Sequence, residues 1–333
     1  METLLFKDSE SEIQKAADII SRGGLVAFPT ETVYGLGADA LNPEAVKKVY
    51  AAKGRPSDNP MIVHISHKDQ LKQLTFDITE DMKLLMDNFW PGPMTMIVKR
   101  KSIIPDETTG GLDTVGVRMP ANETARKLIE YSGCSIAAPS ANLSGKPSPT
   151  RADHVINDLK GRVDGIICGP ECKVGIESTV IDMTGDIPMI LRPGGYTIQD
   201  FERVLGKPVR LDPTLNKRPD SFSGDFTPKA PGMKYKHYAP DGEMTLFQGD
   251  PKAVKKAIED EKSRLEAQGL KVKTIIFDWE NEQDAAHRLF AELRDADSQK
   301  ADVILCSALP EKGLGFSVMN RMMKSAGYNI RNV

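Results

Sequence analysis

Short apolar runs alternate along the first part of the chain with stretches in which apolar residues recur every three or four positions. Ile13, Ala16, Ala17 and Ile20, for example, fall on one helical face. The pattern predicts helices at residues 10–22, 43–52, 80–88 and 123–132. It predicts strands at residues 25–28, 61–65, 95–99, 115–118, 135–138, 163–168 and 178–182. This mixture is typical of an α/β domain, which we expect to end near Gly206.

The last part of the chain, residues 241–333, repeats strand and helix three times. Strands are predicted at 244–248, 272–278 and 302–306, and helices at 251–268, 283–296 and 316–326. A βαβαβα order predicts a parallel sheet covered by helices. Gly313 and Gly315 precede the last helix, but a dinucleotide fingerprint needs a third glycine and a later acid. We therefore interpret them as a helix-entry turn in a small Rossmann-like domain.

Residues 207–240 separate these domains and contain six prolines with little periodicity, which is typical of a linker. The segment contains seven Lys and Arg residues but only three Asp and Glu residues, although the whole chain carries a net charge of −3. The segment also concentrates the aromatic side chains Tyr235, His237 and Tyr238. Two interpretations stay open: a linker that docks on a domain, or a flap over a site. We predict domains at 1–206 (catalytic), 207–240 (linker or lid) and 241–333.

The overall composition excludes several classes of protein. A weakly acidic chain lacks the broad basic field of a typical nucleic-acid binder. Cys168 and Cys172 have no second pair of ligands in zinc register, so we expect reduced thiols and no metal site. No signal peptide and no apolar run near the ~18 residues of a membrane span is found. These features predict a cytoplasmic protein without membrane association.

The loop at residues 137–150 is rich in hydroxyl and amide groups, including Ser140, Asn142 and Ser148. Three prolines in it fix φ and exclude a helix or an inner strand. Ser, Asn, Gly and Pro also form ordinary turns, so a turn and a ligand-binding loop are both open on composition. A P-loop is excluded because Pro147 stands where the hydroxyl after Gly145-Lys146 is required.

Other polar groups follow predicted strands or helices. Residues 29–37 place Thr30, Thr32 and Tyr34 beside two glycines after a strand, where open α/β sheets bind ligands. Cations and hydroxyl or amide groups also follow or end other predicted strands and helices. They are Lys53, Arg55, Ser57, Asn59, Arg118, Ser178 and Arg192. His64 fits either a buried histidine or a substrate contact. Since no carboxylate pair and no nucleophile elbow is seen, we predict a site that binds and positions an anionic substrate.

Seven separated motifs together resemble the YrdC-like L-threonylcarbamoyl-AMP synthases, in the two-domain branch. The motifs are Pro29-Thr-Glu-Thr-Val-Tyr-Gly-Leu-Gly, Lys53-x-Arg55, Trp90-Pro-Gly-Pro-x-Thr95, Gly116-x-Arg-x-Pro120, Ala138-Pro-Ser-Ala-Asn-x-Ser-Gly145, Glu177-Ser-Thr-Val180 and Arg192-Pro-Gly. The linker sequence Pro231-Gly-Met-x-Tyr-x-His-Tyr and the βαβαβα tail extend the resemblance to nearly the whole chain. It implies a twisted mixed-sheet catalytic domain followed by the Rossmann-like domain.

The resemblance implies that L-threonine, bicarbonate and ATP give L-threonylcarbamoyl-AMP and pyrophosphate, the first step of t6A formation at tRNA position 37. Its active-site signature corresponds to Lys53, Arg55, Ser140 and Asn142. Its threonine-binding set corresponds to Thr30, His64, Arg118, Ala138 and Ser178. Its ATP-binding set corresponds to Lys53, Arg55, Ser57, Asn59, Thr114, Ser140, Ser148, Arg192 and His237. Tyr235, His237 and Tyr238 are expected to form the lid.

The implied chemistry adds further expectations. Either His64 or an ATP phosphate oxygen is a candidate base for the threonine amine. Mg²⁺ is expected to be held mainly by phosphates, with no metal ligands from the protein. The product is expected to pass to a downstream threonylcarbamoyl transferase. An RNA-binding module is the main alternative, and weak RNA binding is kept as an expectation. A carbamoyltransferase-type regulatory domain would need acylphosphatase-like and zinc-ribbon segments, which this chain lacks.

Overall fold

The structure is a computed structural model that describes residues 2–215, 229–231 and 237–333. It divides into two compact units, Met1–Ser144 with Ser148–Lys234, and Gly145–Pro147 with Tyr235–Val333. No helix in these described ranges has the length and apolar character to span a membrane. The predicted linker is described only in part, so the domain boundaries of the sequence analysis stay predictions.

The first unit is built on an eleven-stranded sheet in the order β1-β8-β2-β3-β7-β4-β6-β5-β9-β10-β11. The strands are β1 (Leu4–Lys7), β2 (Val26–Phe28), β3 (Gly35–Asp39), β4 (Ile62–His64), β5 (Met94–Lys99), β6 (Thr114–Arg118), β7 (Ile136–Ala137), β8 (Gly165–Cys168), β9 (Thr179–Asp182), β10 (Met189–Arg192) and β11 (Arg210–Leu211). β6 pairs in parallel with β4 and antiparallel with β5. The expected α/β class with a mixed sheet is therefore confirmed.

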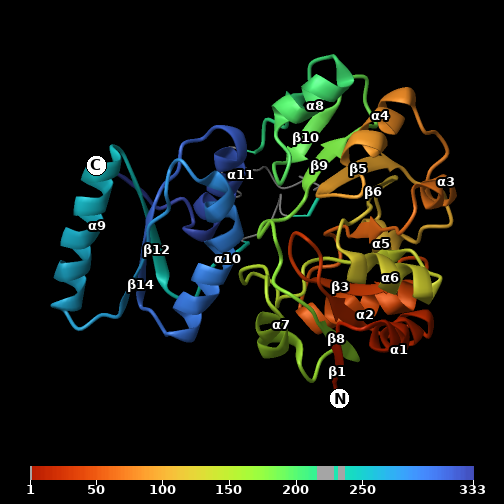
Figure 1. The fold of residues 1–333 in the computed structure, drawn as a ribbon, viewed down its shortest axis with the longest axis horizontal. Helices are drawn as coiled ribbons and strands as arrows, with labels where there is room; N and C mark the ends of the chain where they lie inside the picture. The colour runs from red at the N-terminus through yellow and green to blue at the C-terminus, as the bar shows by residue number, and fades with distance from the viewer. Residues whose placement is uncertain (1, 216–228, 232–236) are drawn as a thin grey trace. The chain divides into compact units, whose positions relative to one another are not determined.

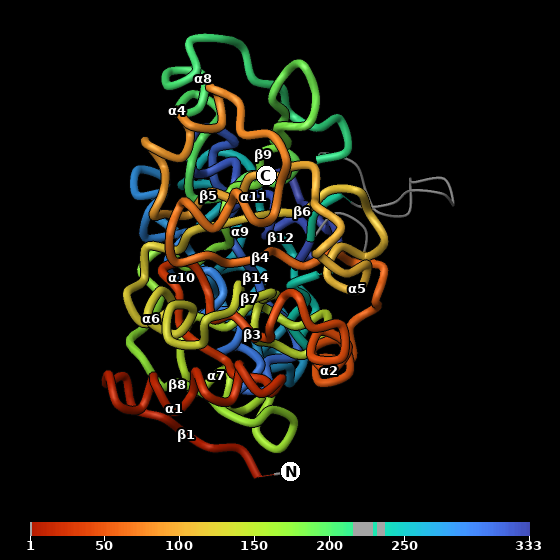
Figure 2. Tube along the Cα trace, turned by 90° about the vertical axis from the view of Figure 1, so that its right-hand side faces the viewer, coloured from red at the N-terminus to blue at the C-terminus, as the bar shows by residue number. Residues whose placement is uncertain are grey.

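Helices cover this sheet at several places. They are α1 (Glu10–Ser21), α2 (Pro43–Lys53), α3 (Leu71–Leu74), α4 (Glu80–Phe89), α5 (Asp106–Thr109), α6 (Glu123–Ser132), α7 (Ala152–Leu159) and α8 (Ile198–Leu205), with the 3₁₀ helix η1 (Lys68–Gln70). α1 packs against α6, and α4 packs against α8 beside β9 and β10 (Figures 1 and 2). Two apolar clusters fill the space between helices and sheet.

Local sequence explains the helix that precedes the Lys53-Gly-Arg55 segment. Asn42 caps α2 by accepting hydrogen bonds from two backbone amides, and Pro43 occupies its first turn, as predicted. Gly54 ends α2 at φ 63°, a left-handed conformation that suits glycine. The strand β3 was not among the predicted strands. Phe28 explains the difference, because its ring packs where a Gly37 side chain would lie.

The second unit carries a four-stranded, all-parallel sheet in the order β13-β14-β12-β15. Its strands are β12 (Glu243–Gln248), β13 (Val272–Ile275), β14 (Val303–Ser307) and β15 (Ile330–Asn332), and its helices are α9 (Pro251–Glu266), α10 (Glu282–Ser298) and α11 (Gly313–Ser325). The parallel βαβαβα prediction is confirmed, with β15 as an extra edge strand. Gly313 opens α11, and the Gly315 amide donates to a carboxylate oxygen of Glu282 at 3.0 Å.

Candidate active site

Neighbouring strands bring three predicted or newly found polar residues into one row across the sheet. His64 of β4 is the register partner of Arg118 of β6, and Arg118 is the partner of Thr95 of β5. Register partners on adjacent strands project to the same face of a sheet. All three side chains are buried. The fold therefore places an imidazole, a guanidinium and a hydroxyl side by side within the interior of the first unit.

Arg118 is held from three directions. It donates to a carboxylate oxygen of Glu31 at 2.6 Å, to the Thr32 hydroxyl at 2.9 Å and to the Gly92 carbonyl at 3.4 Å. Burial alone would raise the pKa of the Glu31 carboxyl, but the charge and hydrogen bond of Arg118 hold that pKa below its ordinary value. The Glu31 carboxyl is therefore ionised near neutral pH. Thr32, which the predicted threonine set omits, contacts Arg118 of that set directly.

The Thr30 hydroxyl, which the resemblance assigns to threonine binding, is hydrogen-bonded within its own turn. Its hydroxyl donates to the Val33 carbonyl at 2.6 Å and accepts from the backbone amides of Thr32 and Val33. These bonds form a local hydroxyl-capped turn. The Thr30 hydroxyl also lies 2.9 Å from the Thr32 hydroxyl. Threonine binding by Thr30 stays a prediction, and the contacts make Thr32 the better-placed candidate.

Ser178 and Arg192 lie in direct contact. Arg192 donates to the Ser178 hydroxyl at 3.1 Å and to its carbonyl at 3.0 Å, and the Ser178 hydroxyl also lies 2.8 Å from that of Thr95. The predicted threonine set and the predicted ATP set therefore meet at these residues. Pro231, from the beginning of the aromatic linker motif, accepts a bond from Arg192 at 3.4 Å. This part of the linker docks on the first unit.

The loop that carries Ser140 and Asn142 is held by Lys53. The Lys53 ammonium donates to the carbonyl oxygens of both residues, and the Lys53 side chain is buried. The Ser140 hydroxyl donates to the Asn142 side-chain oxygen at 2.5 Å. Lys53 therefore contacts this loop directly. The four signature residues are thus partly brought together, with Lys53 as the clamp of the loop.

Farther along the same loop, the Ser148 hydroxyl donates to a carboxylate oxygen of Glu177 at 2.6 Å, and both residues are buried. No carboxylate was predicted in the site. The structure adds two, Glu177 beside Ser148 and Glu31 beside Arg118. Both lie inside the quoted motifs, next to Ser178 and between Thr30 and Thr32. Their positions were available from the sequence, but their burial and partners were not.

Arg55 and Asn59 occupy the turn after α2. Arg55 donates to the carbonyls of Asn59 and Pro60 at 3.3 and 3.1 Å. The Asn59 side chain is 2% exposed, and its oxygen has no hydrogen-bond partner within the described residues. A buried polar atom without a partner is costly, and a ligand donor would remove that cost. Of the other predicted residues, Thr114 and Ala138 are buried and Ser57 is exposed.

His64 is neutral near pH 7. Burial, and then the charge of Arg118, lower its pKa to about 3. Its Nδ1 lies 3.1 Å from the Ile62 carbonyl, which suits a protonated Nδ1 in the neutral ring. A group with so low a pKa is a weak base. This argues against His64 as the acceptor of the amine proton.

The predicted lid residues divide between described and undescribed parts of the chain. Tyr235 lies outside the described residues. Tyr238 is buried in the second unit, where its ring centroid is 5.1 Å from that of Phe290, and its φ is 64°. His237 lies beside it, with ring centroids 5.6 Å apart. Tyr238 therefore anchors the end of the linker to the second unit.

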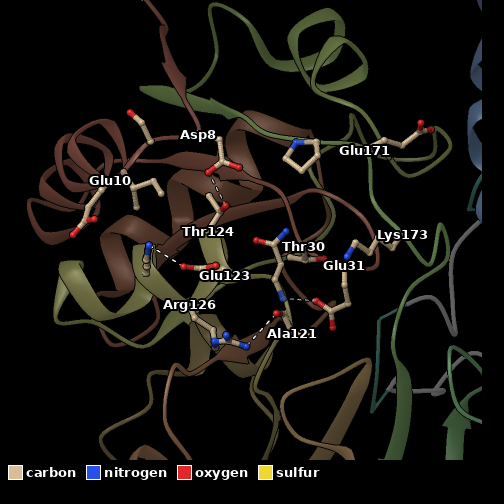
Figure 3. A pocket seen from close by; sticks show the side chains of 15 residues that line it. Asp8, Glu10, Thr30, Glu31, Ala121, Glu123, Thr124, Arg126, Glu171 and Lys173 are labelled. Carbon is tan, nitrogen blue, oxygen red and sulfur yellow. Dashed lines mark hydrogen bonds and ion pairs between the residues drawn. The ribbon is translucent and has the colours of Figure 1, made fainter.

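A pocket of about 620 Å³ lies in the first unit beside Glu31 (Figure 3). The starts of α1 and α6 line it, together with Thr30, Glu31, Pro170, Glu171 and Lys173. No group of three or more Asp, Glu, His or Cys side chains suited to a metal occurs among the residues described.

Comparison with known proteins identifies the family. A family model described as "Telomere recombination" matches residues 18–194, and one described as "Threonylcarbamoyl-AMP synthase, C-terminal domain" matches residues 196–327. Threonylcarbamoyl-AMP synthase of Pyrococcus abyssi is 47% identical over 97% of this chain and 96% of its own. The chain belongs to the threonylcarbamoyl-AMP synthase family. The expected two-domain branch is confirmed by the second model.

Other members of this enzyme family agree. Threonylcarbamoyl-AMP synthase of Bacillus subtilis is 43% identical, covering 96% of this chain and 94% of its own. The crystal structure of P. abyssi Sua5 complexed with L-threonine is similar over 100% of both chains, with 46% identity and a TM-score of 0.93. The fold described above is therefore the fold of a two-domain family member.

Proposed function

We propose that this threonylcarbamoyl-AMP synthase joins L-threonine, bicarbonate and ATP into L-threonylcarbamoyl-AMP with release of pyrophosphate, as the first step of t6A37 formation. One observation carries the proposal for this site: Arg192 of the predicted ATP set bonds to Ser178 of the predicted threonine set. Two substrates bound at adjoining groups are oriented for reaction, which supplies much of the rate enhancement in group transfer.

Arg118 binds the threonine carboxylate in this proposal. Its buried guanidinium is oriented by neighbours in the first unit, and such a fork matches a carboxylate. Thr32 and Ser178 offer hydroxyls to the amine or hydroxyl of threonine. Because His64 is neutral and weakly basic, an ATP phosphate oxygen is the better candidate for the amine proton. The neutral amine attacks the carbon of bicarbonate, and loss of water gives the carbamate.

The carbamate oxygen then attacks the α-phosphorus, and pyrophosphate leaves. The loop held by Lys53 presents Ser140, Asn142 and Ser148 to the nucleotide, and the Arg192 charge stabilises the phosphates. Mg²⁺ would accompany the phosphates of ATP rather than protein ligands. The mixed anhydride product is prone to hydrolysis. We include a closing linker, hand-over to a downstream transferase and weak RNA binding in the proposal.

Pyrophosphate release tests the proposal. We expect release from ATP to require both L-threonine and bicarbonate, and to fall to background when either is omitted. L-serine, which lacks one methyl group, is a matched control and should support slower release at equal concentration. Release from ATP alone, or RNA binding with no ATP consumption, would contradict the proposed reaction.

A further inference from the structure

Glu31 contacts the predicted threonine-binding arginine but is not assigned to any substrate. Its side chain is 9% exposed and that of Arg118 is 5% exposed, with 2.6 Å between their charged atoms. The other Glu31 oxygen accepts a hydrogen bond from the backbone amide of Asn122 at 3.4 Å. Asn122 is the N-cap residue of α6. Glu31 is thus fixed from both ends, by α6 on one side and by the guanidinium on the other.

The three hydrogen bonds of Arg118 do not use all of its N–H groups. A guanidinium has five N–H groups. The three bonds to Glu31, Thr32 and Gly92 use one N–H on Nε and one on each terminal nitrogen. Within the described structure, one N–H therefore remains on each terminal nitrogen. The carboxylate of a substrate can accept hydrogen bonds from such N–H groups.

We propose that Glu31 is a positioning residue that turns Arg118 so that its two remaining N–H groups receive the threonine carboxylate. This inference rests on the proposed function. Glu31 does not touch substrate in this role and acts only through Arg118. The claim concerns the orientation of the guanidinium, so it predicts an effect on threonine binding and none of comparable size on ATP binding.

The neighbouring pocket indicates why the orientation of the Arg118 guanidinium depends on Glu31. Glu31 lines this pocket of about 620 Å³, whereas Arg118 is not among its lining residues (Figure 3). An alanine at position 31 would remove the side chain that lies between Arg118 and the pocket. The guanidinium could then turn toward solvent in this pocket, which is lined by both acidic and basic side chains, among them Glu171 and Lys173. Its orientation toward a substrate carboxylate would be lost.

Steady-state kinetics of Glu31→Ala, Glu31→Gln and Glu171→Ala test the inference. We expect Glu31→Ala to raise the KM for L-threonine at least ~10-fold, the equivalent of one lost hydrogen bond, with the KM for ATP changed less than about twofold. Glu31→Gln keeps an oxygen that accepts from Arg118 and should restore most of the affinity. Glu171 lines the same pocket and is exposed, so its replacement should leave both constants unchanged.

KM does not depend on how much of a sample is folded, so a merely structural role would lower the apparent kcat and leave the KM for threonine unchanged. That result, or equal rises in both KM values, would overturn the inference. A wild-type enzyme that releases no threonine-dependent pyrophosphate would instead overturn the proposed function, which keeps the two failures distinct. Calorimetric titration of each variant with L-threonine gives the same comparison without turnover.

Discussion

Lys53 gives the sharpest test of how the loop with Ser140 and Asn142 is held. The Lys53 residue is 3% exposed, and its ammonium donates to the carbonyl oxygens of both loop residues. Lys53→Met keeps the apolar stem and removes the charge. Hydrogen bonds to charged groups contribute about 1.5–3 kcal/mol each. Since two such bonds are lost, the free energy of unfolding should fall by about 3 kcal/mol or more.

The same change should cost activity through the position of the loop. A misplacement of about 1 Å can lower a rate about 100-fold, so we expect Lys53→Met to lower kcat by about that factor. Lys48→Met is the matched control, because Lys48 lies on the same helix and also donates to a backbone carbonyl, that of Gly23 at 2.8 Å. Urea unfolding and pyrophosphate release provide the two measurements. Lost activity with an unchanged free energy of unfolding would show that Lys53 acts on substrate directly and would refute the reasoning.

Three further predictions follow from single contacts. The His64 pKa is about 3 when folded and 6.5 in its ordinary state. As the pH falls, the unfolded chain therefore takes up the proton before the folded chain does. The free energy of unfolding of the wild type should fall by about 4–5 kcal/mol between pH 6.5 and 3 because of this group. Urea unfolding of a His64→Gln variant should not show this loss. Gly194→Ala would bring a methyl group within 2.3 Å of the Thr179 amide and should lower the melting temperature, whereas Gly185→Ala, with nothing within 4 Å, should not. Ser178→Ala removes the hydroxyl that contacts Arg192 and Thr95 but keeps the carbonyl that accepts from Arg192, and it should raise the KM for L-threonine about tenfold in the pyrophosphate assay.

Periodicity and turn chemistry predicted most of the architecture. Asn42, Pro43 and Gly54 mark the ends of α2 by local hydrogen bonds and backbone conformation, so a sequence alone reveals them. The strand β3 was missed because its glycines resemble a loop. Its burial depends on the Phe28 ring, which packs over Gly35 and Gly37. Such a contact between neighbouring strands has no signature in a single sequence.

The candidate site, like the fold, could be predicted from the sequence only in part. Motif order located Arg118, Ser178 and Arg192, and the fold brings the last two into contact. The partners of Glu31 and Glu177 could not be predicted, because Arg118 and Ser148 lie far from them along the chain. The pKa of His64 could not be predicted either. His64 and an ATP phosphate oxygen were both candidate bases, and the desolvated position of His64 beside a cation lowers its pKa to about 3, which favours the phosphate oxygen.

In the proposed reaction, one site condenses threonine and bicarbonate with the adenylate of ATP. Mass spectrometry of the product formed from isotopically labelled bicarbonate and labelled L-threonine tests this reaction. We expect a single adenylate that contains one labelled carbonyl carbon and one labelled threonine, formed in equal amount to pyrophosphate. A threonyl adenylate without the labelled carbon, or AMP without either label from the first turnover, would contradict it.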